Sequence, residues 1–263
     1  MSRRVALLRQ VSPALARCEL EHLARQPIDL GAAESQHREY GALLARLGYE
    51  VRTLAAEERF PDCVFVEDTA LVLPEVTVLA RPGAASRRGE VEAVGAALAE
   101  LRPRLPEARI DAPGTLDGGD VLRLEGDSRR RVFVGRSRRT DGDGIGQLRD
   151  HLALHGYEVV PVAVSGCLHL KTAVTQIGPG RLLANPDWLD LSPFLGLDVL
   201  AVDPAEPFAA NALLVAGRVV YPRAHPRTRR RLEEGGIAVE TVEVAELEKA
   251  EGGVTCCSLL FEA

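Results

Sequence analysis

Three similar segments spaced 40 residues apart decide the fold: Gly156-Tyr-Glu-Val-Val-Pro-Val162, Gly196-Leu-Asp-Val-Leu-Ala-Val202 and Gly236-Ile-Ala-Val-Glu-Thr-Val242. Each begins with a glycine and continues as an apolar-rich strand. Gly48-Tyr-Glu-Val-Arg-Thr-Leu54 is a fourth copy, and residues 108–112 form a fifth copy without the glycine. Self-similarity at a fixed period of this size indicates one supersecondary unit used several times.

A segment with helical spacing precedes each copy. Its apolar residues recur at intervals of three, four and seven, which predicts an amphipathic helix. The glycine is then the residue just past the helix, where a left-handed backbone lets the chain turn back into a strand. The apolar positions are Tyr40, Leu43, Leu44 and Leu47; Val91, Val94, Leu98 and Leu101; Ile145, Leu148 and Leu152; and Trp188, Leu191 and Leu195.

From the second module onward, a pair of short β runs stands ahead of each helix, separated by turns such as Gly126-Asp-Ser and Gly178-Pro-Gly. The unit is therefore strand, strand, helix, strand, used about five times. The last helix, expected at residues 228–234, is weakly patterned. Residues 245–251 and a final strand at 254–261 close the chain and are expected to complete the first module. Such repeats either stack or close radially, and the period alone does not choose between them.

Composition excludes several classes of protein. The 263 residues are 46% apolar, which is typical of a globular chain. The 38 acidic residues outnumber the 32 basic ones, so nucleic acid and membrane partners are not expected, and the Arg129–Arg131 and Arg229–Arg231 runs are interpreted as solvated. No signal peptide, membrane span or Gly-rich nucleotide loop is visible. Five cysteines without a Cys-x-x-Cys pair predict free thiols and a cytoplasmic location.

Equivalent positions of radially arranged units form a ring around one end of the axis, and that ring is where chemistry is expected. A thiol, an imidazole and a carboxylate there would make a nucleophile, a base and an orienting group. Each also has a bland interpretation: a buried cysteine, a satisfied histidine, or aspartates that close a turn. The ring holds Asp62, Glu67 and Asp68; Asp117; His169; Arg81 and Arg139; and Cys256 from the expected final strand.

Clustered carboxylates without a matching cation favour a cationic ligand or a metal. Asp62, Glu67 and Asp68 lie within seven residues of one another between apolar neighbours. By spacing alone, neither Arg81 nor Arg139 stands out among the arginines of this chain.

Several of these segments together resemble dimethylarginine dimethylaminohydrolase, a family of guanidino-group-modifying enzymes. The resemblance runs in order from about Gln36 to the C-terminus. The matching segments are Asp62-Cys-Val-Phe-Val-Glu-Asp68, Leu116-Asp-Gly-Gly-Asp-Val121, Ala80-Arg-Pro-Gly83, Phe133-Val-Gly135 with Arg139-Thr140, Leu168-His-Leu-Lys171 and Thr255-Cys-Cys-Ser258. The two segments that begin at Asp62 and Leu116 are long enough to be specific. The resemblance implies an α/β fold, a five-bladed propeller of pseudo-symmetric ββαβ units, spanning residues 1–263 as one domain.

The implied reaction is hydrolysis of Nω-methylated arginines to citrulline and a methylamine. Cys256 matches the family nucleophile, His169 the general acid and base, and Asp117 the carboxylate that orients the imidazole. Asp68 matches the residue that holds the guanidinium, Asp62 suits the α-amino group, and Arg81 and Arg139 match residues that grip the α-carboxylate. The full set of substrate-binding matches is Leu20, Asp62, Glu67, Asp68, Arg81, Arg139 and Ala250.

One departure and several alternatives remain. The chain has Ala250-Glu251-Gly252 where the family commonly has Val-Asp-Gly, so a longer carboxylate lies near the guanidino end. Arginine deiminase, an amidinotransferase and a non-catalytic binding propeller are the alternatives to a methylarginine hydrolase. No cofactor and no catalytic metal are implied, although Cys257, Cys256 and His169 offer ligands for an inhibitory zinc ion. The partner is a small-molecule substrate; the oligomeric state stays open, with a homodimer as one option.

Overall fold

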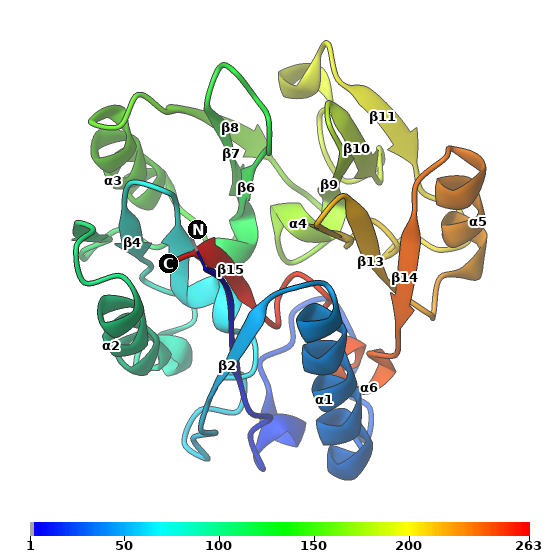
Figure 1. Cartoon of the computed structure of the whole chain (residues 1–263), viewed down its shortest axis with the longest axis horizontal. Helices are drawn as coiled ribbons and strands as arrows, with labels where there is room; N and C mark the ends of the chain where they lie inside the picture. Colours follow the sequence, from blue (N-terminus) through cyan, green and yellow to red (C-terminus); the bar gives the residue numbers. More distant parts are fainter. Residues whose placement is uncertain (1–2) are drawn as a thin grey trace.

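The computed structural model describes residues 3–263 as five three-stranded mixed sheets arranged around a common centre, with the longer helices outside (Figure 1). In every sheet the middle strand pairs antiparallel with one neighbour and parallel with the other. The sheets consist of β15 (Leu259–Glu262), β1 (Arg4–Arg9) and β2 (Glu50–Leu54); β3 (Ala70–Val72), β4 (Thr77–Leu79) and β5 (Glu107–Arg109); β6 (Val121–Arg123), β7 (Arg131–Arg136) and β8 (Glu158–Ala163); β9 (Val174–Gly178), β10 (Arg181–Ala184) and β11 (Asp198–Ala201); and β12 (Leu213–Val215), β13 (Arg218–Pro222) and β14 (Val239–Val242).

The radial arrangement of ββαβ units confirms the predicted fold class. The C-terminal strand β15 pairs antiparallel with β1, so the two ends of the chain close the first module together. The repeated glycines turn the chain as expected, because Gly48, Gly156, Gly196 and Gly236 all have positive φ, between 72° and 91°.

The outer helices bury the apolar face that the spacing predicts. They are α1 (Leu30–Arg46), α2 (Glu90–Leu101), α3 (Gly142–Ala153) and α5 (Pro226–Glu234). The fourth module differs from the prediction. Its segment forms only the 3-10 turn η5 (Ser192–Phe194), because Pro186 and Pro193 interrupt the hydrogen-bonding run that an α-helix needs.

Short helical turns replace strand at the inner end of several modules. The turns are η2 (Val66–Thr69), η4 (Gly118–Asp120) and the single-turn helix α4 (Leu170–Ala173); η1 (Leu15–Arg17), η3 (Ala85–Arg87) and α6 (Ala245–Glu248) lie elsewhere. Glu67 and Asp68 therefore lie in η2 and not in the first short β run expected for the second module. The expectation of strand at Cys256 and Cys257 is also wrong: both lie in a turn before β15, where the Cys256 N–H donates to the Gly253 carbonyl.

The core is divided among clusters of buried apolar side chains that fill the space within and between the sheets and under the outer helices. The largest unites α1 with the segment that carries Cys256. Within residues 3–263, no helix is both long and apolar enough to cross a membrane.

The Tyr40 hydroxyl ties α1 to this segment and gives a test of the packing. It donates to the Val254 carbonyl at 2.8 Å and lies 2.7 Å from the Ser258 hydroxyl, fully buried. We expect Tyr40→Phe to lower the free energy of unfolding by about 1–2 kcal/mol, because two buried polar groups lose a partner. Urea unfolding measures the loss. Tyr49→Phe, in a half-buried ring, is the control, and an equal loss in both variants would contradict the assignment.

Candidate active site

Three equivalent short turns bring the predicted catalytic groups together. Asp68 lies in η2, Asp117 directly precedes η4, and His169 directly precedes α4. Glycines make this approach possible. A Cβ atom on Gly118 would lie 1.9 Å from the Glu67 carbonyl oxygen, and one on Gly119 would lie 2.6 Å from His169 Nδ1. The two glycines of the Leu-Asp-Gly-Gly-Asp motif are therefore required by packing against the site.

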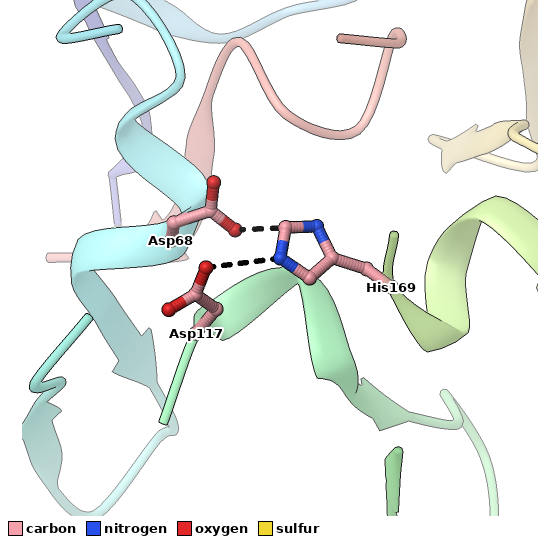
Figure 2. Close-up of side chains that lie close together, drawn as sticks. All are labelled: Asp68, Asp117 and His169. Carbon is pink, nitrogen blue, oxygen red and sulfur yellow. Dashed lines mark hydrogen bonds and ion pairs between the residues drawn. The ribbon is translucent and has the colours of Figure 1, made fainter. Parts of the chain in front are cut away.

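The imidazole of His169 is held by two carboxylates. His169 Nε2 lies 3.0 Å from Asp117 Oδ2, and Nδ1 lies 3.8 Å from Asp68 Oδ1. Figure 2 shows both carboxylates turned toward the ring. The other Asp117 oxygen accepts from the Gly83 N–H at 2.8 Å. All three side chains of the cluster are buried, so each contact acts in a poorly solvated environment.

This arrangement favours a charged histidine. Burial by itself would lower the pKa of His169, but the negative charge of Asp68, Asp117 and Asp120 outweighs it and raises the pKa to about 9. Burial would likewise raise the pKa of Asp68, but His169 and Arg87 outweigh it and lower that pKa to about 2. At neutral pH the site therefore contains an imidazolium beside ionised Asp68.

Cys256 sits at this charge cluster but is a neutral thiol. Burial, followed by the negative charges of Glu67 and Asp68, raises its pKa to about 12. The Gly253 N–H donates to its sulfur at 3.3 Å, and its own carbonyl accepts from the Glu67 N–H. Cys257 instead donates to the Gly253 carbonyl within the core. Of the two adjacent cysteines, Cys256 is the one that lines the cavity described next.

A cavity joins the catalytic cluster to the loop at residues 19–23. The volume of this cavity is about 10 Å³, which is enough for roughly one water molecule. A neighbouring cavity of about 200 Å³ shares Leu168, Glu251 and Gly252 with it. The smaller cavity is lined by Glu19, Asp62, Phe65, Asp68, Arg87, Arg139, Leu168, His169, Ala250, Glu251, Gly252 and Cys256.

Most of the predicted site residues meet at this cavity. Asp62, Asp68, Arg139, Ala250, His169 and Cys256 line it, and Asp117 stands behind His169. The carboxylate of Asp62 accepts from the Glu19 N–H at 3.2 Å, and burial raises its pKa. Burial also disfavours the charge on Arg139, but Glu21 and Asp117 outweigh it and raise its pKa.

Three predicted residues do not line this cavity. Arg81 donates to the Gly114 carbonyl at 3.0 Å, because its strand end pairs with Leu116 and aims the guanidinium at that loop. Glu67 forms an ion pair with Lys171 and accepts a hydrogen bond from the Thr255 hydroxyl. It lines a separate, third cavity among the innermost strands. Leu20 packs, half-buried, against the core beside Glu19.

Sequence reasoning missed Arg87, a buried arginine that lines the cavity, whereas the expected Arg81 does not. The guanidinium of Arg87 donates to Asp68 Oδ2 at 2.6 Å and to Glu90 Oε2 at 2.8 Å. The Arg-Pro-Gly motif serves another purpose. A Cβ on Gly83 would lie 2.5 Å from the Arg139 carbonyl oxygen, so the motif brings the chain against Arg139 and Asp117. The signal for Arg87 was Glu90, three residues on, the spacing of a helical ion pair.

The same cluster has the composition of a metal site. Asp68, Asp117 and His169 each offer a ligand atom, and these atoms lie within 4.8 Å of one another. Both carboxylates, however, already accept hydrogen bonds from N–H groups, Asp68 from Arg87 and Gly119. A histidine whose pKa is raised holds a proton on the nitrogen that a metal would need. The cluster is therefore explained as an ion-pair network.

Comparison with known proteins places the chain in a family. It is 38% identical over 259 residues to an N(G),N(G)-dimethylarginine dimethylaminohydrolase of Streptomyces coelicolor, covering 98% of this chain and 97% of the relative. The enzyme of that name from Pseudomonas aeruginosa is 36% identical over 233 residues, with 89% and 90% covered. The chain belongs to the dimethylarginine dimethylaminohydrolase family. No model of a known protein family matches it.

A solved structure supports this membership and the fold. A cysteine-to-serine mutant of the Pseudomonas aeruginosa enzyme, complexed with citrulline, superposes with a TM-score of 0.91 at 32% identity, covering 99% of this chain and 100% of that one. The propeller expected from the resemblance is thereby confirmed.

The charge state of His169 can be tested directly. We expect Asp117→Asn to lower the pKa of the imidazole from about 9, because a neutral amide no longer stabilises the charged ring. NMR titration of the ring protons measures this, with Asp143→Asn on the surface of α3 as the control. An unchanged midpoint in Asp117→Asn would contradict the assignment.

The same shift predicts a pH-dependent stability. The pKa of His169 is raised from 6.5 to about 9 on folding. Its contribution to the free energy of unfolding is therefore fully present below pH 6.5 and is lost as the pH rises through about 9. Thermal unfolding of the unmodified protein and of His169→Gln across this pH range checks the direction of this effect. The difference between their unfolding midpoints should become smaller as the pH rises.

Proposed function

We propose that this chain hydrolyses Nω-methylated arginines to citrulline and a methylamine, with Cys256 as nucleophile, His169 as general acid and base, and Asp117 as the group that orients His169. The activity rests on membership of a family whose named relatives are 36–38% identical over most of the chain. The residue roles rest on one observation: the buried thiol of Cys256 lines the same cavity as an imidazole held by carboxylates.

Charge divides the proposed binding contacts. Ionised Asp68 attracts the guanidinium of the substrate and is held in place by Arg87. Arg139 receives the α-carboxylate, because a planar guanidinium can donate two parallel hydrogen bonds to it. Asp62, at the same end of the cavity as Glu19, receives the α-amino group. Citrulline is the small ligand named for the Pseudomonas aeruginosa complex.

The first half-reaction begins with ionisation of the thiol. The guanidinium of the substrate adds positive charge beside Cys256, and it lowers the thiol pKa enough for the proton to leave to solvent. The thiolate then attacks the guanidino carbon and forms a C–S bond. His169, already protonated, gives its proton to the departing amine nitrogen as the C–N bond breaks, leaving a covalent thiouronium.

The second half-reaction uses the same histidine as a base. Neutral His169 takes a proton from water, and the hydroxide adds to the thiouronium carbon. The C–S bond then breaks as the hydroxyl proton of this tetrahedral intermediate passes to the sulfur, which releases citrulline and returns the neutral Cys256 thiol. Asp117 stabilises the imidazolium at both points and holds the ring in one orientation, as a triad carboxylate does.

Product analysis tests the reaction and the nucleophile together. We expect asymmetric dimethylarginine to give citrulline and dimethylamine, monomethylarginine to give citrulline and methylamine, and Cys256→Ala to give neither, with a loss of at least about 10³-fold in kcat. Mass spectrometry of the products measures this. Citrulline and ammonia from arginine alone would instead assign a deiminase.

The pH dependence of thiol alkylation tests how Cys256 is activated. Because the free thiol has a pKa of about 12, its iodoacetamide labelling should keep rising tenfold per pH unit from pH 6 to 9 without a plateau. Peptide mass spectrometry separates Cys256 from Cys18, Cys63 and Cys167, and fragment ions of the labelled peptide separate it from adjacent Cys257. A plateau near neutral pH would show a thiolate already present without substrate and would contradict this step.

We further infer a cytoplasmic location from the five cysteines, all of which are free although Cys256 and Cys257 are adjacent. We also propose that residues 1–263 act as one domain, since the cavity draws residues from four of the five modules. A homodimer stays a prediction.

A further inference from the structure

The loop at residues 19–23 carries a carboxylate that sits on the proposed substrate-binding arginine. Arg139 Nε donates to Glu21 Oε1 at 2.5 Å. The Arg139 side chain is only 5% exposed and that of Glu21 is 21% exposed, so the contact is largely shielded from water. This is a charge-assisted hydrogen bond in a partly buried setting, where such bonds are stronger than at a free surface.

Glu251 fixes the loop in this position. Its Oε1 accepts from three successive backbone N–H groups, those of Glu21, His22 and Leu23, at 3.0, 2.6 and 2.6 Å. The backbone of Glu251 has a φ of 58°, a left-handed conformation that costs a non-glycine residue free energy. Glu19 adds a further tie through the Ser86 hydroxyl at 2.6 Å. The position of Glu21 is thus set by several contacts.

Arg139 is only partly satisfied by Glu21. Its Nη1 atom is buried and finds no hydrogen-bond acceptor among residues 3–263; Asp117 Oδ2 lies 3.7 Å away. A ligand carboxylate that spans two guanidinium nitrogens would satisfy this donor as well, which a contact through Nε alone does not. The cavity beside it has room for about one water, so the carboxylate of a ligand finds no space against Arg139 while Glu21 stays there.

We propose that Glu21 is a specificity-determining residue that occupies Arg139 in place of the substrate α-carboxylate, so that a carboxylate-bearing ligand must displace it to bind. The proposal rests on the function proposed above, in which Arg139 receives that carboxylate. Glu251 holds the loop so that Glu21 returns to Arg139 when the ligand leaves. The internal carboxylate therefore weakens binding of amino-acid ligands and assists release of the product.

The proposal distinguishes ligands by a single group. Citrulline carries the α-carboxylate, whereas N-carbamoylputrescine has the same urea and chain without it. Only citrulline competes with Glu21, because the decarboxylated ligand leaves the Glu21–Arg139 pair intact. In the unmodified protein, Arg139 is available to citrulline only in the fraction of molecules in which Glu21 has left it. Removing the charge of Glu21 should raise that fraction and strengthen citrulline binding by the same factor, with no effect on the other ligand.

Isothermal titration calorimetry of the full chain with both ligands tests this. We expect Glu21→Gln to tighten citrulline binding about 3- to 30-fold and to change N-carbamoylputrescine binding less than about 2-fold. Glu34→Gln is the matched control, because it removes the same charge from the exposed face of α1, where Glu34 pairs with Arg38. We expect it to change neither affinity.

The outcomes separate the two proposals. Unchanged or weaker citrulline binding in Glu21→Gln, or equal tightening of both ligands, would overturn the role of Glu21 while leaving the proposed function in place. Failure of citrulline to bind either the unmodified protein or the variant would overturn both. A thermal unfolding midpoint equal to that of the unmodified protein confirms that Glu21→Gln is folded.

Discussion

A positively charged imidazole held by two buried carboxylates is the interaction on which the rest of the site depends. Isolated charges in a protein interior are costly, so His169 can be an imidazolium only because Asp117 and Asp68 lie against it. Those carboxylates are held in turn by Gly83, Gly119 and Arg87. Close packing at Gly83, Gly118 and Gly119 leaves no space for a side chain at these positions.

Asp68 acts on both reactive groups, and they end in different charge states. With Asp117 and Asp120 it raises the pKa of His169, which is therefore charged; burial, followed by Glu67 and Asp68, raises the pKa of Cys256, which is therefore neutral. The free protein therefore holds a protonated imidazole and a neutral thiol. In the proposed reaction, a guanidinium ligand adds positive charge where the carboxylates lie, so recognition of the substrate and activation of the thiol depend on one electrostatic feature.

The proposed catalytic residues lie together as the motifs predicted, whereas some of the proposed binding residues lie elsewhere. Cys256, His169 and Asp117 stand in short segments specific enough to be matched by type and order. Arg81 was expected in the site because the Ala-Arg-Pro-Gly segment resembles the family, but that motif shapes the backbone near Arg139. In a chain with so many arginines, the direction of each guanidinium depends on its partners, and for Arg87 these are the buried Asp68 and Glu90.

The repeat, the ββαβ order and the turns at its glycines could be predicted from the amino-acid sequence, because hydrophobic period and left-handed glycines are local properties of the chain. The residue types able to react could also be listed from it. The folded chain was needed to show that Cys256 and His169 share a cavity, that Cys256 lies in a turn, and that Glu21 and Glu251 meet across 230 residues. Burial and charge pairing depend on neighbours distant in sequence, and these exist only once the five sheets have closed into a ring.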